Sequence, residues 1–258
     1  MVLKFWNEKI QNKTMRPSYT LEKIKFGTDP TTFQKAVDLY EKGKMTQFKE
    51  HVREYSAIVL GTHPYHVDVH AKNYDRGYCE CYLGQTDVLC KHMVAVALWA
   101  VMEGKLLSDT DKNTIDGVIS SGKTGELSKK ELTGIEKKIT SALHYIKSYG
   151  GPSKTWFAYQ NSLDEGVARL SAIASELPIS KQTTDFVIDL LLRLDKKVCE
   201  GGVDDSNGTV GNFMIEAVEM LKEYAKTDPL IMECFKRFRD IETCFGWEEP
   251  LLRLIDKH

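Results

Sequence analysis

The chain has 258 residues and a formal net charge of −2, and 42% of its residues are hydrophobic and 28% charged. These values are close to those of average globular proteins and exclude a largely disordered chain, while the length suits one large domain or two small ones. No stretch approaches the roughly 18 apolar residues of a membrane span, and the first residues lack the apolar core of a signal peptide. We therefore expect a cytoplasmic protein with no membrane partner. Disulfides are disfavoured there, so closely spaced cysteines indicate metal or redox chemistry.

Charge is distributed unevenly along the chain. Residues 1–55 hold eleven Lys and Arg against seven Asp and Glu, whereas residues 166–258 hold twelve against seventeen. The basic start permits an anionic partner in the N-terminal part. The near-neutral total does not indicate a general polyanion-binding protein.

The first part of the chain predicts a helix, then a sheet, then a second helix. Asp29-Pro30 has the form of an N-cap followed by a first-turn proline, and the helix that it starts ends at Gly43. The period then changes to two, which predicts an antiparallel sheet of three or four strands over residues 45–48, 55–60, 65–70 and 78–82. Residues 90–103 follow as an apolar helix.

The rest of the chain predicts helices after a polar connection. Residues 105–127 are rich in Gly, Ser, Thr and Asp and predict a linker. Helical periodicity follows over residues 128–148, 156–177, 181–199, 212–226, 228–244 and 248–258. The predicted fold class is α+β, a small antiparallel sheet with its own helices and then an all-helical C-terminal region. The predicted parts are residues 1–104, the linker 105–127, and a helical bundle or helical-repeat-like domain over 128–258.

One cluster of cysteines and a histidine carries the clearest chemistry. Cys79-x-Cys81 lies at the end of a predicted strand, and Cys90-x-His92 opens a helix after eight further residues. Residues i and i+2 of a strand point to the same face, so the first two thiols can converge on one ion. The intervening residues include Gly84 and can reverse the chain, which lets the second pair complete the tetrahedron that Zn²⁺ prefers. We predict one zinc ion bound by Cys79, Cys81, Cys90 and His92.

The donor set predicts a structural zinc site. Four protein ligands leave no coordination position for a substrate water, unlike the ligands of catalytic zinc. Three thiolates on Zn²⁺ leave about one negative charge, which a helix N-terminus favours. Two alternatives stay open, namely three buried cysteines beside an unrelated histidine, and a redox Cys-x-Cys pair. The strand-turn-helix context argues against both.

The spacing Cys-x-Cys-x8-Cys-x-His resembles that of the SWIM-type zinc finger family. The small apolar residues 93–98 after the histidine and the turn and strand over 61–69 also resemble that family. The resemblance covers roughly residues 30–103, with the finger core at about 65–103. Residues 203–208, before a predicted helix, are similar to a segment in the C-terminal part of bacterial SWIM-containing proteins. The resemblance implies a protein that binds DNA or a protein partner and is not an enzyme by itself.

Two kinds of partner remain open. The acidic helical region and the near-neutral charge favour a protein partner, with the chain as an interaction or adaptor module that has no small-molecule substrate. The alternative is DNA, bound by basic side chains near the finger and by tyrosines that could stack on bases. The basic candidates are Lys35, Lys42, Lys44, Lys49, Arg53 and Lys91, and the aromatic candidates are Tyr74, Tyr78 and Tyr82. The same basic residues also suit an ordinary solvated surface.

Two further motifs are not interpreted as functional. Residues 117–124 fit the P-loop pattern, but a hydrophilic segment precedes them where a P-loop needs a buried strand, which favours a flexible linker. His66, Asp68 and His70 share one face of a predicted strand, with His63 nearby. We interpret them as a solvated strand face in preference to a second metal site.

The C-terminal region contains a loop that imitates a calcium site. With Asp205 as the first position, Glu216 falls at the twelfth, but Val210 stands where an EF-hand needs glycine. A loop that caps the helix starting near Asn212 is the preferred interpretation. The remaining cysteines lie on predicted helices and are interpreted as buried small apolar residues: Cys199, Cys234 and Cys244.

Overall fold

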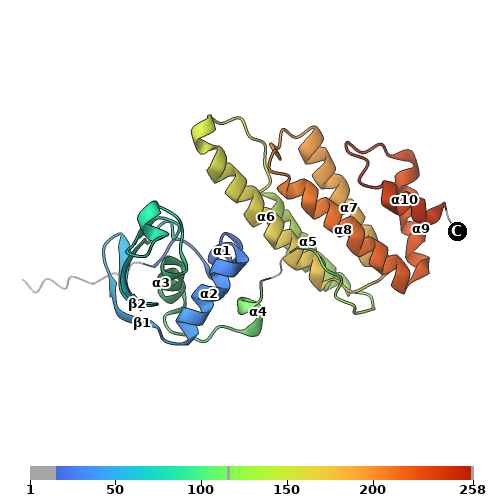
Figure 1. Ribbon diagram of the computed structural model, residues 1–258. Coiled ribbons are helices and arrows are strands. Elements are labelled where there is room, and N and C mark those ends of the chain that lie inside the picture. The colour runs from blue at the N-terminus through green and yellow to red at the C-terminus, as the bar shows by residue number, and fades with distance from the viewer. Residues whose placement is uncertain (1–15, 115–116, 257–258) are drawn as a thin grey trace, which may run out of the picture. The chain divides into compact units, whose positions relative to one another are not determined.

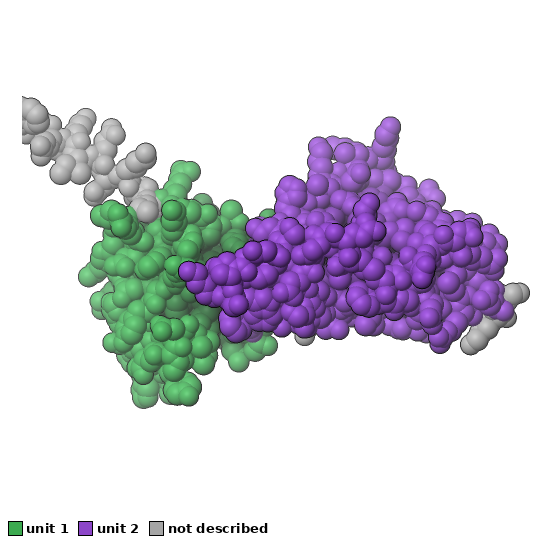
Figure 2. Space-filling model, turned by 90° about the horizontal axis from the view of Figure 1, so that it is seen from above, with its two compact units in different colours: residues 1–24, 31–112 green, residues 25–30, 113–258 purple. Residues whose placement is uncertain are grey.

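The computed structural model describes residues 16–114 and 117–256 (Figure 1). Expectations for residues 1–15 therefore lie outside the described part. The chain divides into two compact units, coloured separately in Figure 2: unit 1 comprises residues 1–24 and 31–112, and unit 2 comprises residues 25–30 and 113–258. The predicted α+β fold class is confirmed, because a four-stranded antiparallel sheet precedes a helical C-terminal region.

The N-terminal elements follow the predicted order of helix, sheet and helix. In chain order they are α1 Leu21–Phe26, α2 Pro30–Glu41, β1 Met45–Glu50, β2 Glu54–Leu60, β3 Pro64–His70, β4 Gly77–Cys79, the 3-10 turn η1 Gly84–Thr86, α3 Lys91–Met102 and α4 Asp109–Lys112. Helix α2 starts at the predicted proline, and Gly43 follows its end with a φ of 59°, a conformation that glycine adopts without steric cost.

The sheet of unit 1 is a meander in which each strand pairs with the next one along the chain. Alternate residues of β2 and β3 are buried, including Tyr55, Val59 and Val67, and this face packs on α3. Residues 92–98 of α3 are all buried, so the helix is the centre of the unit 1 core. The opposite face of β3 carries the exposed His66 and His70.

Strand β4 is shorter than predicted. The expected strand over residues 78–82 ends at Cys79, and Cys81 lies in the following bend. The prediction that Cys79 and Cys81 share one strand face is therefore wrong. They converge because the backbone turns sharply after the strand.

Unit 2 consists of helices and short helical turns. Its elements are α5 Lys129–Leu143, η2 Ser153–Thr155, α6 Trp156–Glu176, α7 Lys181–Cys199, α8 Thr209–Thr227, η3 Pro229–Ile231, α9 Met232–Phe235, η4 Lys236–Asp240 and α10 Glu249–Ile255. Helix α5 packs on α6, α6 on α8, and α8 on α7 around one apolar core. No helix in the described residues is long and apolar enough to cross a membrane.

The connection between the units differs from the linker predicted over residues 105–127. Helix α4 lies in unit 1, and the unit boundary follows Lys112. From Gly117 onward the chain is held by unit 2: the Val118 amide donates to the Glu216 carboxylate at 3.0 Å, and the Ser121 hydroxyl donates to the Leu177 carbonyl at 2.7 Å. Backbone and side-chain hydrogen bonds therefore fix this segment to unit 2.

The helix predicted over residues 228–244 is broken. It is replaced by η3, α9 and η4, and the chain is irregular from Ile241 until α10. Cys244 lies in this irregular segment, is exposed, and forms a disulfide with Cys199. The prediction of separate buried thiols is therefore wrong for these two residues, whereas Cys234 is a buried free thiol.

Candidate metal centre

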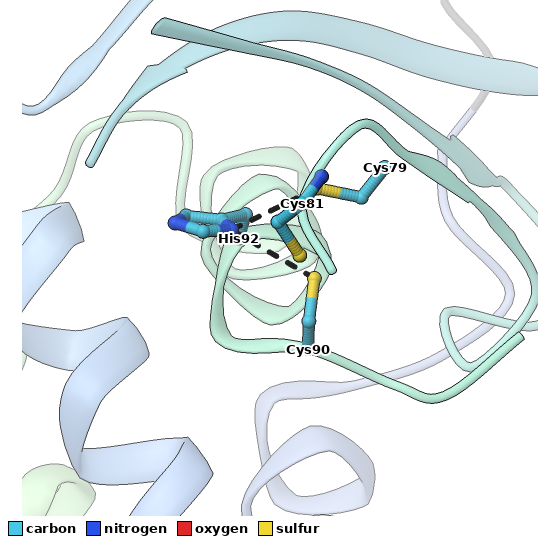
Figure 3. Close-up of side chains that lie close together, drawn as sticks. All are labelled: Cys79, Cys81, Cys90 and His92. Carbon is cyan, nitrogen blue, oxygen red and sulfur yellow. Dashed lines mark hydrogen bonds between the residues drawn. The ribbon is translucent and has the colours of Figure 1, made fainter. Parts of the chain in front are cut away.

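The four predicted ligands come together in unit 1 (Figure 3). Cys79 is the last residue of β4 and pairs with Val67 of β3, so the sheet fixes its backbone. Cys90 is the N-cap of α3 and His92 lies in its first turn. Because α3 packs on the sheet, the same contact that forms the unit 1 core brings both cysteine pairs together.

The distances within the cluster suit one tetrahedral ion. The four ligand atoms all lie within 4.8 Å of one another. His92 Nδ1 lies 3.7 Å from the Cys79 sulfur and 3.9 Å from the Cys90 sulfur. Ligand bonds of ~2.3 Å to sulfur and ~2.0 Å to nitrogen in a tetrahedron imply an S···N separation of about 3.5 Å. The residues therefore fit Zn²⁺ with only a small contraction of the cluster.

All four ligands are buried. The exposed fraction is 0% for Cys79, 8% for Cys81, 1% for Cys90 and 4% for His92. Three thiols and one imidazole are a borderline-soft donor set, which suits Zn²⁺ better than Ca²⁺ or Mg²⁺. The cluster could hold a metal ion in which every coordination position is filled by protein.

Backbone amides and neighbouring thiols donate hydrogen bonds to the cysteine sulfurs of the cluster, and such bonds stabilise thiolates. The Cys81 amide donates to the Cys79 sulfur at 3.5 Å, and the Gly84 amide donates to the Cys81 sulfur at 3.4 Å. A hydrogen bond from the Cys79 thiol lowers the pKa of Cys90, and the same bond, with burial, raises the pKa of Cys79. Buried thiols that share protons in this way gain a common partner when a divalent cation replaces those protons.

Two glycines leave the space that the cluster needs. A Cβ on Gly84 would lie 2.4 Å from the Cys79 carbonyl oxygen and 2.5 Å from the Cys79 Cβ, so the chain reversal requires glycine. A Cβ on Gly61 would lie 2.9 Å from His92 Nε2 and 3.0 Å from the Tyr65 ring. Gly61 therefore permits the imidazole to rest against the β2–β3 turn with Nδ1 directed at the sulfurs.

The buried Nε2 atom of His92 has no hydrogen-bond partner among the described residues. When Nδ1 binds a metal, Nε2 carries the proton, and ligating histidines generally donate that proton to an acceptor. Here the Tyr65 ring lies beside the imidazole, with 4.7 Å between ring centroids. Packing against Gly61 and Tyr65 thus orients the ring in place of a hydrogen bond.

The residues proposed for DNA binding lie on several elements. Lys35, Lys44, Lys49 and Arg53 are exposed, Lys42 forms an ion pair with Asp38 at 2.8 Å, and Lys91 is half-buried in the first turn of α3. Tyr82, next to a cluster cysteine, is 81% exposed, and Tyr78 is 48% exposed. The prediction for Tyr74 is wrong: it is 3% exposed and its ring packs edge-on against Tyr19 in the unit 1 core.

The histidines of β3 do not form a second metal cluster. His66 Nδ1 lies 3.3 Å from the Asp68 carboxylate, but His66, Asp68 and His70 do not bring three ligand atoms together. In residues 16–114 and 117–256, the other group of potential ligands is Asp195, Cys199 and Cys244 in unit 2. Sequence reasoning missed that group because its cysteines are 45 positions apart and no local spacing pairs them.

The other two motifs have structural roles. The loop precedes a helix as predicted, but α8 begins at Thr209 and not near Asn212, and its N-cap is Gly208. The Asp205 carboxylate accepts hydrogen bonds from the Val210 and Gly211 amides of the first turn at 2.9 and 2.8 Å. The P-loop-like segment 117–124 runs along unit 2, where Thr124 forms an isolated bridge with Ile179, and α5 begins only at Lys129.

Comparison with known proteins does not assign the chain to a family. No family model matches the chain, and neither a curated protein nor a solved structure is significantly similar to it. The SWIM-type resemblance therefore depends on the ligand spacing and its structural context.

Proposed function

We propose that this chain is a non-enzymatic interaction module whose N-terminal unit is a SWIM-type finger built around one structural Zn²⁺. The observation that carries the proposal is the buried Cys79, Cys81, Cys90 and His92 cluster, in which the distance from the imidazole nitrogen to the sulfurs suits a tetrahedral ion. Four protein donors and full burial leave no position for a substrate water, so the ion stabilises the fold and takes no part in catalysis. The residue spacing supports the SWIM-type assignment.

Metal analysis tests the zinc site directly. The full chain, purified under reducing conditions without chelator, is expected to contain one equivalent of zinc, and Cys79→Ser and His92→Ala are expected to lose it. Cobalt substitution gives a second readout, because tetrahedral thiolate ligation produces intense visible absorption bands. Material with reduced thiols and far less than one equivalent of zinc would contradict the proposal.

A protein partner is the first candidate for what the module binds. Around the cluster, the exposed apolar side chains are Tyr78, Tyr82, Leu83 and Val88. Exposed apolar patches mark contact sites for other proteins, and aromatic residues are enriched in such interfaces. Affinity purification of the wild-type chain and of Tyr82→Ala from the native cell tests this candidate, since a genuine partner should be lost or depleted with the variant.

DNA is the second candidate, favoured by Tyr82 together with the exposed Arg53 and Lys49. Base stacking on aromatic rings and phosphate contacts would both contribute. A salt titration separates the candidates, because phosphate contacts make affinity fall steeply with salt concentration. No binding of DNA even at low salt would remove the second candidate.

A further inference from the structure

A second cysteine site lies at the end of the helical unit. Cys199 is the last residue of α7, and Cys244 lies in the irregular segment between η4 and α10. They form a disulfide with their Cα atoms 6.3 Å apart. This separation lies within the range of about 4.4–6.8 Å that disulfides span.

The two cysteines of this site are less buried than the other cysteines of the chain. Cys244 is exposed and Cys199 is half-buried. The four free cysteines of the chain are all buried. Thiol–disulfide exchange requires that the attacking thiolate reach a sulfur. Of the six cysteines, this pair is therefore the one best placed to react with a small thiol or disulfide, and Cys244 is the more exposed residue of the two.

The segment that carries Cys244 is also held by contacts that do not depend on the bond. Asp195 of α7 accepts hydrogen bonds from the Cys244 amide at 3.2 Å and from the Trp247 indole at 2.8 Å. Trp247 is buried and packs edge-on against Phe238, with 5.4 Å between ring centroids. These contacts keep the two sulfurs near each other after reduction, so the bond can form again.

We propose that Cys199 and Cys244 are a redox-active thiol pair that reacts with low-molecular-weight disulfides, and that oxidation locks the C-terminal segment onto α7. In the first step the Cys244 thiolate attacks a disulfide RSSR, forms a mixed disulfide and releases one thiol RSH. In the second step the Cys199 thiolate attacks the Cys244 sulfur and releases a second RSH. Two thiol hydrogens and two electrons pass from the protein to RSSR, and excess RSH reverses both steps.

The expected consequence is a change in local opening. The bond closes a 45-residue separation that includes α8, η3, α9 and η4. In the reduced chain, the segment is held by noncovalent contacts such as those of Asp195 and Trp247, and Phe245 beside Cys244 is 76% exposed. Reduction is therefore expected to raise the frequency of opening in residues 241–248 and to leave the core of unit 2 folded.

The test uses the full zinc-loaded chain equilibrated in glutathione buffers from reducing to oxidising. After an acid quench and alkylation, peptide mass spectrometry should show a Cys199–Cys244 linkage that appears and disappears with the buffer. The metal-cluster cysteines and Cys234 should stay alkylatable on unfolding, and bound zinc should stay constant. Cys244→Ser should abolish the linkage, and the matched control Cys234→Ser should retain it.

Three results would overturn the proposal. The linkage could be absent in every buffer, it could persist in excess reduced glutathione under native conditions, or the reduced pair could bind a metal through Asp195 that blocks oxidation. Hydrogen exchange supplies an independent readout. Amides of residues 241–248 should exchange more slowly after oxidation of the wild type, with no change in Cys244→Ser, and equal exchange in both redox states would contradict the locking step.

Discussion

The two cysteine sites of this chain are organised in opposite ways. In unit 1, the four residues of the candidate metal cluster lie within residues 79–92, and a strand end, the bend after it and a helix start bring them to one buried point. In unit 2, Cys199 and Cys244 meet near the surface across 45 positions. The residues of the first site are close in sequence, and they pack at the core of unit 1. The second exists only because α7 and the C-terminal segment are packed together.

This difference predicts different roles for the two sites in stability. The metal cluster replaces part of the core of a small unit, whose sheet and α3 surround it, so its ion should be required for folding. The disulfide is added to a unit that already has an extensive apolar core. Its loss should increase local opening of the C-terminal segment and leave the core of unit 2 folded.

Removal of the zinc ion is expected to have the largest effect. Structural zinc sites in finger peptides supply about 10–16 kcal/mol of apparent binding free energy, so Cys79→Ser should unfold unit 1. Circular dichroism should retain most of the helical signal, because the helices of unit 2 contain no cluster ligand. Lys91→Ala is the matched control and should remain folded with zinc bound. A Cys79→Ser variant with the same thermal unfolding as the wild type would contradict the claim that unit 1 requires its ion for folding.

A cavity in the unit 2 core should have the next largest effect. Leu191 of α7 is fully buried, and truncation of a buried leucine costs about 2–5 kcal/mol. Denaturant unfolding of Leu191→Ala should show that loss, and metal analysis should show unchanged zinc. Zinc lost in parallel with stability would indicate that the two units fold together.

Gly84→Ala should specifically damage the metal cluster. The added Cβ meets the Cys79 backbone, which cannot move without shifting β4, and such overpacking typically costs about 1–3 kcal/mol. Competition with a chelator should show weaker zinc binding. The control is Gly134→Ala in α5, where nothing lies within 4 Å of the new Cβ, and helix propensity predicts a gain of up to about 1 kcal/mol.

The smallest expected effect concerns the start of α5. Ser128 and Glu131 form a capping box, and Ser128→Ala should cost about 1 kcal/mol. Hydrogen bonds from the Ser128 hydroxyl and amide lower the pKa of Glu131. Because its folded pKa lies below the unfolded value, the stabilisation is present above the unfolded pKa and is lost as the pH falls through the folded one. Urea unfolding from neutral to acidic pH should show this loss in the wild type, and Ser128→Ala should show less of it.

Short-range patterns in the sequence predicted much of unit 1. The proline-led start of α2, the period-two strands and the apolar α3 each act over a few residues and place side chains on a predictable face. The Cys-x-Cys and Cys-x-His spacing identified the candidate ligands, but not the strand face on which Cys81 lies. The sequence therefore identified the four residues of the cluster, although it did not predict the bend at Cys81.

The tertiary structure decided the features that depend on distant residues. The second half of the predicted linker is held by Glu216 and Leu177, and the helix predicted over residues 228–244 is broken. Tyr74 is buried by its packing against Tyr19. Spacing along the chain carries no information about which remote surfaces meet, because that choice depends on burial of the whole apolar core. The sequence by itself therefore identified the four residues of the candidate metal cluster, and only the packing of unit 2 brought Cys199 to Cys244.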